Sequence, residues 1–279
     1  MNTDCNVRLS VVIVSYNTRD TLARCLEALH DSPPSVTHQI IVVDNASTDE
    51  TVDLIRARWP SLQIIEMNFN AGFSAANNAA IHSSQSEFVL LLNSDTLPSS
   101  NSIDNLVSEL DTNSDVAAVG PRLVNLRGQI EISFGRMISP WNEARQKLVT
   151  LGIAKGVPFF ASWLKRRTHT THYPDWVSGA CMLVRRTDGD AVGWLDERYF
   201  LYTEDVDFCA ALRAFGRRIL FTPKAEVVHI GGQSGARDPL GTRHLYRKSH
   251  LAFYAKHHPS WHAPLRWLLR LRQQLPPSE

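Results

Sequence analysis

The sequence predicts an α/β fold with a mostly parallel β-sheet flanked by helices. The first observation behind this prediction is an alternation, over residues 1–120, between short apolar runs and segments whose apolar residues recur at helical spacing. The second is that the apolar runs are continuous, as in strands that helices cover on both faces. A chain of 279 residues can bury a sizeable core, either as one large domain or as a domain with an appendage.

Four strand–helix pairs account for this part of the chain. The predicted strands are LSVVIVSYN, HQIIVVDNAS, LQIIEMN and FVLLLNSD. The helices that follow them cover about residues 18–30, 47–59, 74–82 and 102–113. In the first helix, one face is shared by Leu22, Cys25, Leu26 and Leu29. We expect Ser47 or Thr48 to cap the second helix, with Asp49 and Glu50 in its first turn, where acids suit the helix dipole.

The second half of the chain is less regular. Residues 125–173 mix Gly, Pro and Trp with a basic cluster, and few elements can be placed there. Beyond them we predict a strand WVSGACMLVRR, a loop WLDERYFLY, a helix from about Glu204 to Phe215, and one or two strands in RRILFTPKAEVVHI. We therefore divide the chain into one half at 8–124, a second half of the same domain at 125–235 and a helical extension at 236–279.

Composition excludes several classes of protein. The 29 Lys and Arg residues nearly balance the 28 Asp and Glu residues, so nothing favours a nucleic-acid partner. The cysteines form no CxxC pair or zinc spacing and are interpreted as reduced thiols, although an even number permits disulfides: Cys5, Cys25, Cys181 and Cys209. No apolar run is long enough to span a membrane, and the start is interpreted as a first strand instead of a signal peptide. We expect a cytoplasmic protein.

Polar residues follow every predicted strand of the first half. The strands end in SYN, VDNAS, NFNAG and NSD. Because parallel strands deliver their carboxyl ends to the same edge of a sheet, and ligands bind there, the pattern predicts a polar ligand site. A GxGxxG loop and a GK[ST] loop are both absent after the first strand, which disfavours a dinucleotide-binding dehydrogenase and a P-loop enzyme.

Three residues at this edge have two interpretations each. Asp44 could accept hydrogen bonds from a ribose or a base, or form a turn with Asn45 and Ser47. Gly72 could allow backbone to approach a ligand, or simply make a turn. Asn77 lies on a helix with an Ala-rich face and could contact the ligand or be a buried, satisfied amide.

The segment TEDVDFC places Glu204, Asp205 and Asp207 at a helix start. Acids stabilise a first helical turn, and Thr203 could cap it, but a cap needs only one or two such groups. A carboxylate held near others gains proton affinity, which suits a general base.

His229 ends the β-branched run VVHI and precedes a Gly-rich loop with Ser234 that could close over a substrate. A histidine at this place is often structural. If it meets Asp95 across the crevice, the two side chains offer one oxygen and one imidazole to Mg²⁺ or Mn²⁺, with phosphate oxygens completing the shell.

The chain resembles family-2-type glycosyltransferases of the GT-A fold, especially bacterial rhamnosyltransferases. The resemblance rests on VVIVSYNT, VVDNASTDET, NAGFSAANNAA, LLLNSDT, WVSGACMLVRR, ERYFLYTEDVDFC and VVHIGGQS, in this order. It implies a Rossmann-like GT-A sheet with a smaller acceptor-side region and a C-terminal helical tail. It also implies an inverting, metal-dependent transfer from a sugar nucleotide.

The resemblance assigns roles to residues of this chain. The residues implied to bind the nucleotide sugar are Val14, Tyr16, Asn17, Asp44, Gly72, Asn77, Asn93, Ser94, Gly179 and Ala180. Asp95 and His229 would hold the metal, Asp205 would be the catalytic base, and Glu204 and Asp207 would shape the acceptor side. Asn93 stands where many relatives have Asp, and the lost charge could lower metal affinity.

We therefore expect a glycosyltransferase that transfers a sugar from a dTDP- or UDP-sugar to a saccharide or a lipid-linked acceptor. Rhamnose is the first candidate for this sugar. The alternatives are a sugar nucleotidyltransferase, which would need a basic Gly-rich loop, and an inactive carbohydrate-binding relative. The tail WHAPLRWLLRLRQQL predicts a basic amphipathic helix with Trp261, Leu265, Leu268 and Leu269 on one side. This helix could lie on the inner face of the plasma membrane, pack on the domain or mediate a homodimer.

Overall fold

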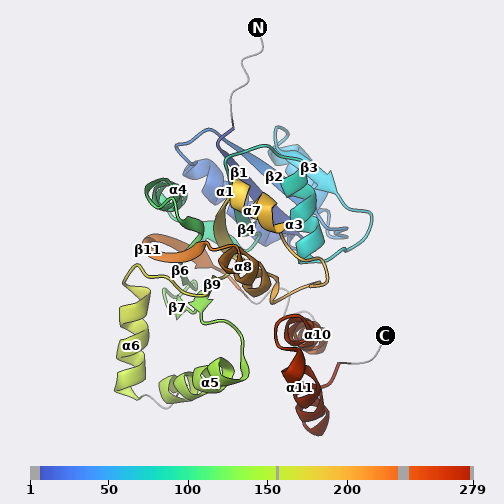
Figure 1. The fold of residues 1–279 in the computed structure, drawn as a ribbon. Helices are drawn as coiled ribbons and strands as arrows, with labels where there is room; N and C mark the ends of the chain where they lie inside the picture. Colours follow the sequence, from blue (N-terminus) through green and yellow to red (C-terminus); the bar gives the residue numbers. More distant parts are fainter. Residues whose placement is uncertain (1–6, 155–156, 232–238, 277–279) are drawn as a thin grey trace.

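The computed structural model describes residues 7–154, 157–231 and 239–276 (Figure 1). The first half contains β1 (Leu9–Ser15), α1 (Arg19–Asp31), β2 (His38–Asp44), α2 (Thr51–Arg58), β3 (Gln63–Glu66), α3 (Phe73–His82), β4 (Phe88–Asn93), β5 (Thr96–Pro98), α4 (Ser102–Thr112) and β6 (Val116–Val124). The second half contains β7 (Ile130–Glu131), β8 (Phe134–Gly135), α5 (Pro140–Ala154), α6 (Pro158–Thr168), β9 (Trp176–Val177), β10 (Cys181–Arg185), α7 (Arg186–Val192), α8 (Glu204–Ala214), β11 (Arg218–His229), α10 (Pro239–His257) and α11 (Pro259–Leu271).

One large sheet has the strand order β3-β2-β1-β4-β10-β6-β11-β5, with β7 paired to β6. The first four of these strands are parallel to one another, as are β6 and β11. β10 is antiparallel to both of its neighbours, β4 and β6. The prediction of an α/β fold with a mostly parallel sheet is confirmed.

The register of the parallel strands aligns their polar ends. Ser15 of β1 pairs with Asp44 of β2, and Val14 pairs with Asn93 of β4. The continuous apolar runs before these residues are almost completely buried. Three neighbouring strands thus end at one edge, as the sequence predicts.

Helices cover both faces of the sheet (Figure 1). On one face, α1 and α4 bury Leu22 and Leu106 in a cluster with residues of β1 and β4. On the other face, α3 and α8 bury Ala76 and Phe208 in a second cluster. The apolar faces of these helices are what fix them on the sheet, because burying a large apolar side chain stabilises the fold by about 1.5–3 kcal/mol.

The predicted start of α2 is wrong. The helix begins at Thr51, and its N-cap is Glu50, whose φ of 61° is left-handed and whose side chain makes no capping hydrogen bond. The Oγ of Ser47 instead accepts a hydrogen bond from the Asn17 backbone N–H at 2.9 Å. The Thr48 backbone N–H donates to the Asn17 side-chain oxygen at 2.8 Å. These residues tie the ends of β1 and β2 together, so they are used in a loop and not in a helical turn.

The second half departs from the prediction in two places and agrees with it in a third. WVSGACMLVRR forms two strands, β9 and β10, because the chain turns at residues 178–180. The stretch from Asn125 to Tyr173, where few elements could be placed, contains two short strands and the helices α5 and α6 among its described residues. RRILFTPKAEVVHI, predicted as one or two strands, forms one strand, β11, with an irregularity between Thr222 and Glu226.

The C-terminal tail is helical, but its outward side differs from the predicted one. Leu269 of α11 is buried, whereas Trp261 and Leu268 of the predicted apolar side are exposed. No helix among the described residues is long and apolar enough to cross a membrane. The division at 124/125 stays a prediction. The boundary at 235/236, the loop around Ser234 and Cys5 lie outside the described residues.

Candidate active site

A pocket of about 330 Å³ lies at the carboxyl ends of β1 and β4. Seven residues predicted to bind a ligand line it: Val14, Tyr16, Asn17, Gly72, Asn93, Ser94 and Asp95. Its other lining residues are neighbours of these in the chain and residues of two later segments: Thr18, Asn45, Asn70 and Phe73, and then Phe200, Leu201, Gly241, Thr242 and Leu245. Its volume and mixed polar and apolar walls are typical of small-molecule sites.

Two carboxamide or carboxylate oxygens at this edge have no hydrogen-bond partner among the described residues. They are Oδ1 of Asp44 and Oδ1 of Asn93, and both are buried. The other oxygen of Asp44 accepts a hydrogen bond from the Ser47 backbone N–H at 2.9 Å, so this side chain does form the predicted turn. Buried polar atoms are rarely left unpaired, and an orphaned acceptor needs a donor such as a ribose hydroxyl or a base N–H.

Gly72 is required by a close contact within the protein. Its φ is +86°, and a Cβ there would lie 2.6 Å from the Phe200 carbonyl oxygen. The same carbonyl accepts a hydrogen bond from the Phe73 backbone N–H at 2.7 Å. The glycine therefore lets the loop that precedes α8 close against the start of α3, and the two loops form one wall of the pocket.

Asn77 is buried in α3, where its amide donates to the Phe73 carbonyl oxygen at 2.8 Å. It is not among the pocket-lining residues. The amide of Asn77 is therefore satisfied within α3, and the residue does not line the pocket.

Asp95 and His229 are brought together by strand pairing. β5 and β11 are antiparallel, with Thr96 opposite His229, and this places His229 Nε2 3.4 Å from Asp95 Oδ1. The other ring nitrogen, Nδ1, lies 2.8 Å from Oε2 of Glu131 in β7. A carboxylate on the far nitrogen of a histidine orients the ring toward a metal and raises its basicity.

The charges around His229 outweigh its burial. Burial alone would lower the pKa of the imidazole, but Asp95 and Glu131 raise the pKa of His229 to about 9. The described residues contain no cluster of three or more His, Cys, Asp and Glu side chains that could hold a metal. Asp95 and His229 can therefore offer two protein ligands, which fits a hard cation that takes further oxygens from phosphate and water.

Asp205 lies at the start of α8, and neither it nor Gly179 and Ala180 are among the residues that line the pocket. Its Oδ2 accepts a hydrogen bond from the Gly179 backbone N–H at 2.9 Å, and its Oδ1 accepts one from the Val206 backbone N–H at 2.8 Å. The next residue of that turn, Ala180, accepts a hydrogen bond from the Asn93 backbone N–H at 2.9 Å. The turn at Gly179 and Ala180 thus connects Asp205 to the end of β4.

The backbone just before α8 is strained. Tyr202 and Thr203 both have left-handed φ angles, 69° and 74°, although neither is glycine. Thr203 occupies the N-cap position without a side-chain capping bond. Strain of this kind, about 1–3 kcal/mol for each residue, is concentrated at functional sites.

The two acids at the start of α8 differ in their partners. Burial raises the pKa of Glu204 well above its usual range, and the neighbouring Asp205 carboxylate raises it further. Burial also raises the pKa of Asp205, although the hydrogen bonds from Gly179 and Val206 oppose this. Oε2 of Glu204 has no hydrogen-bond partner in the described structure. Glu204 is therefore the better proton holder, and Asp205 is better able to stay ionised.

Asp207 points to the C-terminal extension instead of the pocket. Its carboxylate lies 2.7 Å from Lys256 Nζ and 2.6 Å from His257 Nε2, both at the end of α10, and it accepts a hydrogen bond from the Tyr199 hydroxyl at 3.1 Å. The structure thus separates Asp207 from the other two acids and makes it the attachment of α8 to α10.

We expect Asp207→Asn to lower the free energy of unfolding by about 2–3 kcal/mol, since it removes the buried carboxylate that holds His257 and one of the two carboxylates that hold Lys256. Both partners are partly exposed, which keeps the loss below that of a fully buried pair. Chemical denaturation of the purified variant measures this. Asp196→Asn is the control, because Asp196 also pairs with Lys256 but is more exposed, so a smaller loss is expected. A stability equal to wild type for Asp207→Asn would contradict the assignment.

Several residues of the site have no strong signal in the sequence. Glu131 lies in a short strand 98 residues before its partner His229. Asn45 and Asn70 hold the pocket wall: the Asn45 amide donates to Asn70 Oδ1 at 2.9 Å, and its oxygen accepts from the Ala71 backbone N–H at 2.9 Å. Asn70 belongs to NFNAG, the polar end of the third predicted strand, so this motif did point to a residue of the pocket wall. Glu131 had none, because its role depends on a long-range contact.

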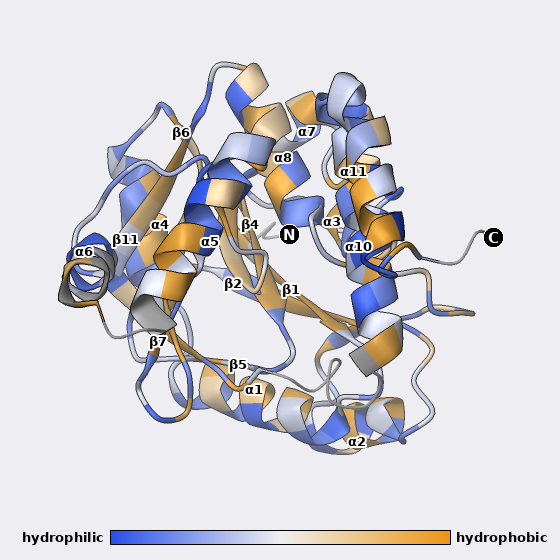
Figure 2. Cartoon of the chain, turned by 90° about the horizontal axis from the view of Figure 1, so that it is seen from below, coloured by the Kyte–Doolittle hydropathy of each residue, from blue (hydrophilic) through white to orange (hydrophobic). Residues whose placement is uncertain are grey.

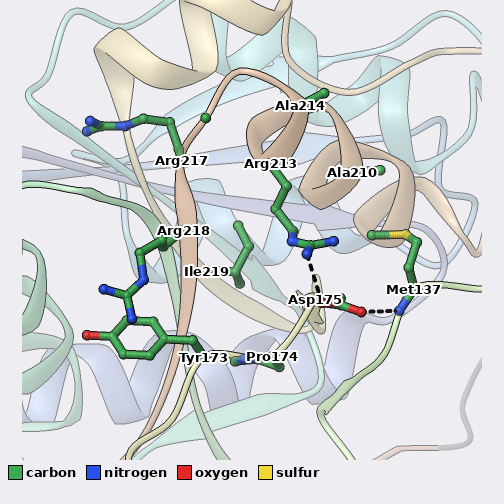
Figure 3. Close-up of a pocket in the computed structure, with 11 residues that line it drawn as sticks. Met137, Tyr173, Pro174, Asp175, Ala210, Arg213, Ala214, Arg217, Arg218 and Ile219 are labelled. Atoms are coloured by element: carbon green, nitrogen blue, oxygen red, sulfur yellow. Dashed lines mark hydrogen bonds and ion pairs between the residues drawn. The ribbon is translucent and has the colours of Figure 1, made fainter.

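A larger cavity of about 530 Å³ lies elsewhere, beside the end of α8 and the start of β11 (Figure 3). Asp175 in this cavity is 3.0 Å from Arg213 and accepts a hydrogen bond from the Met137 backbone N–H at 2.8 Å. Arg218 stacks on Tyr173 and pairs with Asp115. No residue predicted to be functional lines this cavity, and its charged groups have partners within the protein, so the smaller pocket is the candidate site.

Comparison with known proteins gives a consistent result. A family model described as glycosyl transferase family 2 matches residues 10–173. An N-acetylglucosaminyl-diphospho-decaprenol L-rhamnosyltransferase of Mycobacterium tuberculosis is 31% identical over 94% of this chain and 89% of its own length. A low-salt glycan biosynthesis hexosyltransferase of Haloferax volcanii is 26% identical over 74% of this chain and 61% of its own length.

Solved structures share the fold. The mannosyltransferase PcManGT of Pyrobaculum calidifontis, in complex with GDP-Man and Mn²⁺, has a TM-score of 0.62 at 19% identity, covering 89% of this chain and 63% of that one. TarS of S. aureus with UDP-GlcNAc has a TM-score of 0.57 at 16% identity, covering 88% of this chain and 66% of that one. The chain thus spans just under two thirds of either structure. Both are glycosyltransferases of the GT-A fold, which confirms the predicted fold class.

Proposed function

This chain belongs to glycosyl transferase family 2, and from that membership we propose an inverting, metal-dependent transfer of a sugar, rhamnose in first place, from a dTDP- or UDP-sugar to a lipid-linked saccharide. That the protein is a glycosyltransferase follows from the family. The rhamnosyl group and the lipid-linked acceptor are supported by the activity of the mycobacterial relative. One observation carries the proposal: the pocket contains Asp95, while Asp205, from a different element, bonds to the turn whose next residue, Ala180, bonds to Asn93 of the pocket wall.

The donor is proposed to lie in the pocket with its nucleoside over β1 and β2. The orphaned Oδ1 of Asp44 suits a ribose hydroxyl or a base N–H, and Asn17 lines the pocket that would hold the nucleoside. The exposed ring of Tyr16 suits stacking on the base. Asn93 would bond to the ribose as a neutral group, since its Oδ1 is also free of a protein partner in the described structure.

The residues present fit a divalent cation bound by Asp95 and His229. When bound, Mg²⁺ or Mn²⁺ would neutralise the charge that develops on the departing diphosphate. Glu131 holds the imidazole so that Nε2 faces Asp95, and His229 must lose its proton to act as a ligand.

Asp205 is proposed to take the proton from the acceptor hydroxyl. A hydroxyl becomes a useful nucleophile only as its proton is removed, and a positioned base contributes about 10²–10⁴-fold to the rate. Inversion requires attack from the face opposite the leaving diphosphate, so the base and the metal ligands must come from different elements. Asp205 on α8 and Asp95 after β4 satisfy this condition.

The sequence also allowed two other functions, a sugar nucleotidyltransferase and an inactive carbohydrate-binding relative. A nucleotidyltransferase is not supported, because the family is one of glycosyltransferases. An inactive carbohydrate-binding relative would bind sugar nucleotide without turnover, and measurement of sugar transfer separates the two. Asp205, Asp95 and His229 are all present with suitable partners, which favours the enzyme.

We expect a sugar nucleotide with Mn²⁺ to raise the melting temperature. A ligand at 100 times its Kd stabilises the folded state by about 2.7 kcal/mol, which corresponds to roughly 5–10 °C for a chain of this size. The measurement is a thermal-shift screen of dTDP-rhamnose, other dTDP-sugars and UDP-sugars, each with Mn²⁺ and with EDTA. GDP-sugars are the control for base selectivity. No shift with any dTDP- or UDP-sugar would contradict the proposed donor.

The lipid-linked acceptor also implies a place for the protein. We propose peripheral contact with the inner face of the plasma membrane, with α11 among the contacting elements. This helix is basic and exposes Trp267 and Leu271 on its outer side. An amphipathic basic helix of this kind binds anionic membrane surfaces.

A further inference from the structure

The helix α5 presents an apolar stripe to solvent. Trp141, Leu148 and Leu151 are seven and three residues apart, so they lie along one side of the helix. Their exposed fractions are 79%, 63% and 58%. An exposed row of one aromatic and two leucine side chains is unusual for a surface helix and marks an interaction surface.

The segment that contains this stripe is strongly basic. Residues 140–168 hold six Lys and Arg residues and one acid, Glu143, although the whole chain has 29 basic and 28 acidic residues. Arg145 and Lys147 flank the stripe on α5, and Lys165 and Arg166 lie at the end of α6; all four are exposed. Basic side chains next to exposed tryptophan and leucine suit an anionic lipid surface, because long cationic side chains reach the headgroups while the apolar ones enter the boundary.

The helix α11 has the same character. The exposed fractions of Trp267 and Leu271 are 65% and 61%, and Trp261 is also exposed. Arg266 and Arg270 are exposed on the same helix. Leu269, in contrast, is buried, so one side of α11 packs on the protein while Trp267 and Leu271 stay exposed.

Contacts between the second half and the C-terminal extension hold α5 and α11 near each other. The single acid of the α5 segment, Glu143, lies 3.0 Å from His250 and accepts a hydrogen bond from Tyr254, both in α10. His258, which precedes α11, lies 2.8 Å from the Ile138 carbonyl oxygen just before α5. Both helices lie at the same end of the molecule, the end seen from below in Figure 2.

We propose that α5 and α11 form one bilayer-binding face, defined by Trp141, Leu148 and Leu151 of α5 and by Trp261, Trp267 and Leu271 of α11. Its partner is the surface of a bilayer that contains anionic phospholipid. The inference deepens the proposed function and rests on it. α10 joins the face to the catalytic pocket, since its first residues line the pocket and its last residues hold Glu143 and Asp207. A lipid-linked acceptor anchored at this face would present its sugar toward Asp205.

The test is co-sedimentation of the full chain with vesicles, without donor or acceptor. We expect binding to vesicles of phosphatidylcholine with 30% phosphatidylglycerol, chosen as the probe, and at least about tenfold weaker binding to phosphatidylcholine alone. The triple variant Trp141→Ser, Leu148→Ser, Leu151→Ser should bind the anionic vesicles at least about tenfold more weakly, because it removes the apolar area that enters the boundary. The double variant Lys165→Gln, Arg166→Gln should lose roughly fivefold for each charge removed.

The controls change residues of the same kinds outside the proposed face. Phe215→Ser removes one exposed aromatic outside the face, and Arg24→Gln with Arg56→Gln removes two positive charges from α1 and α2. Both controls should bind vesicles like wild type, and all variants should melt like wild type because the substituted side chains are exposed. Wild-type binding by the α5 triple variant would overturn the proposal. So would a concentration-dependent dimer that the same variant abolishes, with no vesicle binding. A failure to bind sugar nucleotide would overturn the proposed function and leave vesicle binding as a separate result.

Discussion

Replacing Asp205 with asparagine is expected to lower the rate of sugar transfer by about 10³-fold, within the range that a positioned general base contributes. Asparagine can still accept the hydrogen bond from the Gly179 backbone N–H, so the turn at residues 178–180 should stay in place. What is lost is the capacity to accept a proton from the acceptor hydroxyl. The measurement is kcat together with the affinity for sugar nucleotide, which should change little.

The pH dependence provides a second readout for the same residue. Because burial raises the pKa of Asp205, the carboxylate takes up a proton at a higher pH than an ordinary aspartate does. The base works only when ionised, so the rate of wild type should fall as the pH drops through this raised pKa, and Asp205→Asn should lack that limb. Asp207→Asn is the control: it should cost stability while keeping the pH limb. Full turnover by Asp205→Asn would remove this residue as the base.

Replacing Asp95 with alanine is expected to weaken the metal-dependent part of donor binding by at least about 100-fold, since even outer-shell partners of a metal contribute about 10–100-fold to its affinity. In the proposed metal site, this change would leave His229 and the phosphate oxygens as ligands. The measurement is a titration of Mn²⁺ in the presence of sugar nucleotide, followed by thermal shift or calorimetry.

Two further variants test whether the loss of metal-dependent donor binding is specific to the proposed metal site. Glu131→Gln keeps the size of the side chain but removes the charge behind His229, so a smaller loss of about 10-fold is expected. Asp20→Ala removes an exposed carboxylate from α1 and should leave the Mn²⁺ titration unchanged. If Asp95→Ala titrates like wild type, the cation binds elsewhere.

The elements that were predicted well are those with a strong local pattern. The strands β1, β2 and β4 are continuous apolar runs bounded by polar turns, and each run must be buried on both faces. The reversed direction of β10 was not predicted, because the apolar pattern of a strand carries no information on its direction within a sheet. The start of α2 was misplaced because Ser47 and Thr48 bond to Asn17, a partner in another segment.

In the candidate site, too, features set by the local sequence were predicted and features set by long-range contacts were not. The sequence by itself determined which residues stand at the carboxyl ends of β1, β2 and β4, because a strand of fixed length and a parallel register deliver them to one edge. It thereby placed six of the predicted residues, those at the ends of β1 and β4, around one pocket. Only the tertiary structure decided that Glu131 orients His229 and that Asp207 binds α10 while its neighbour Asp205 turns to Gly179. These contacts join residues 26 to 98 positions apart, and their geometry depends on how the whole chain packs, which no local pattern encodes.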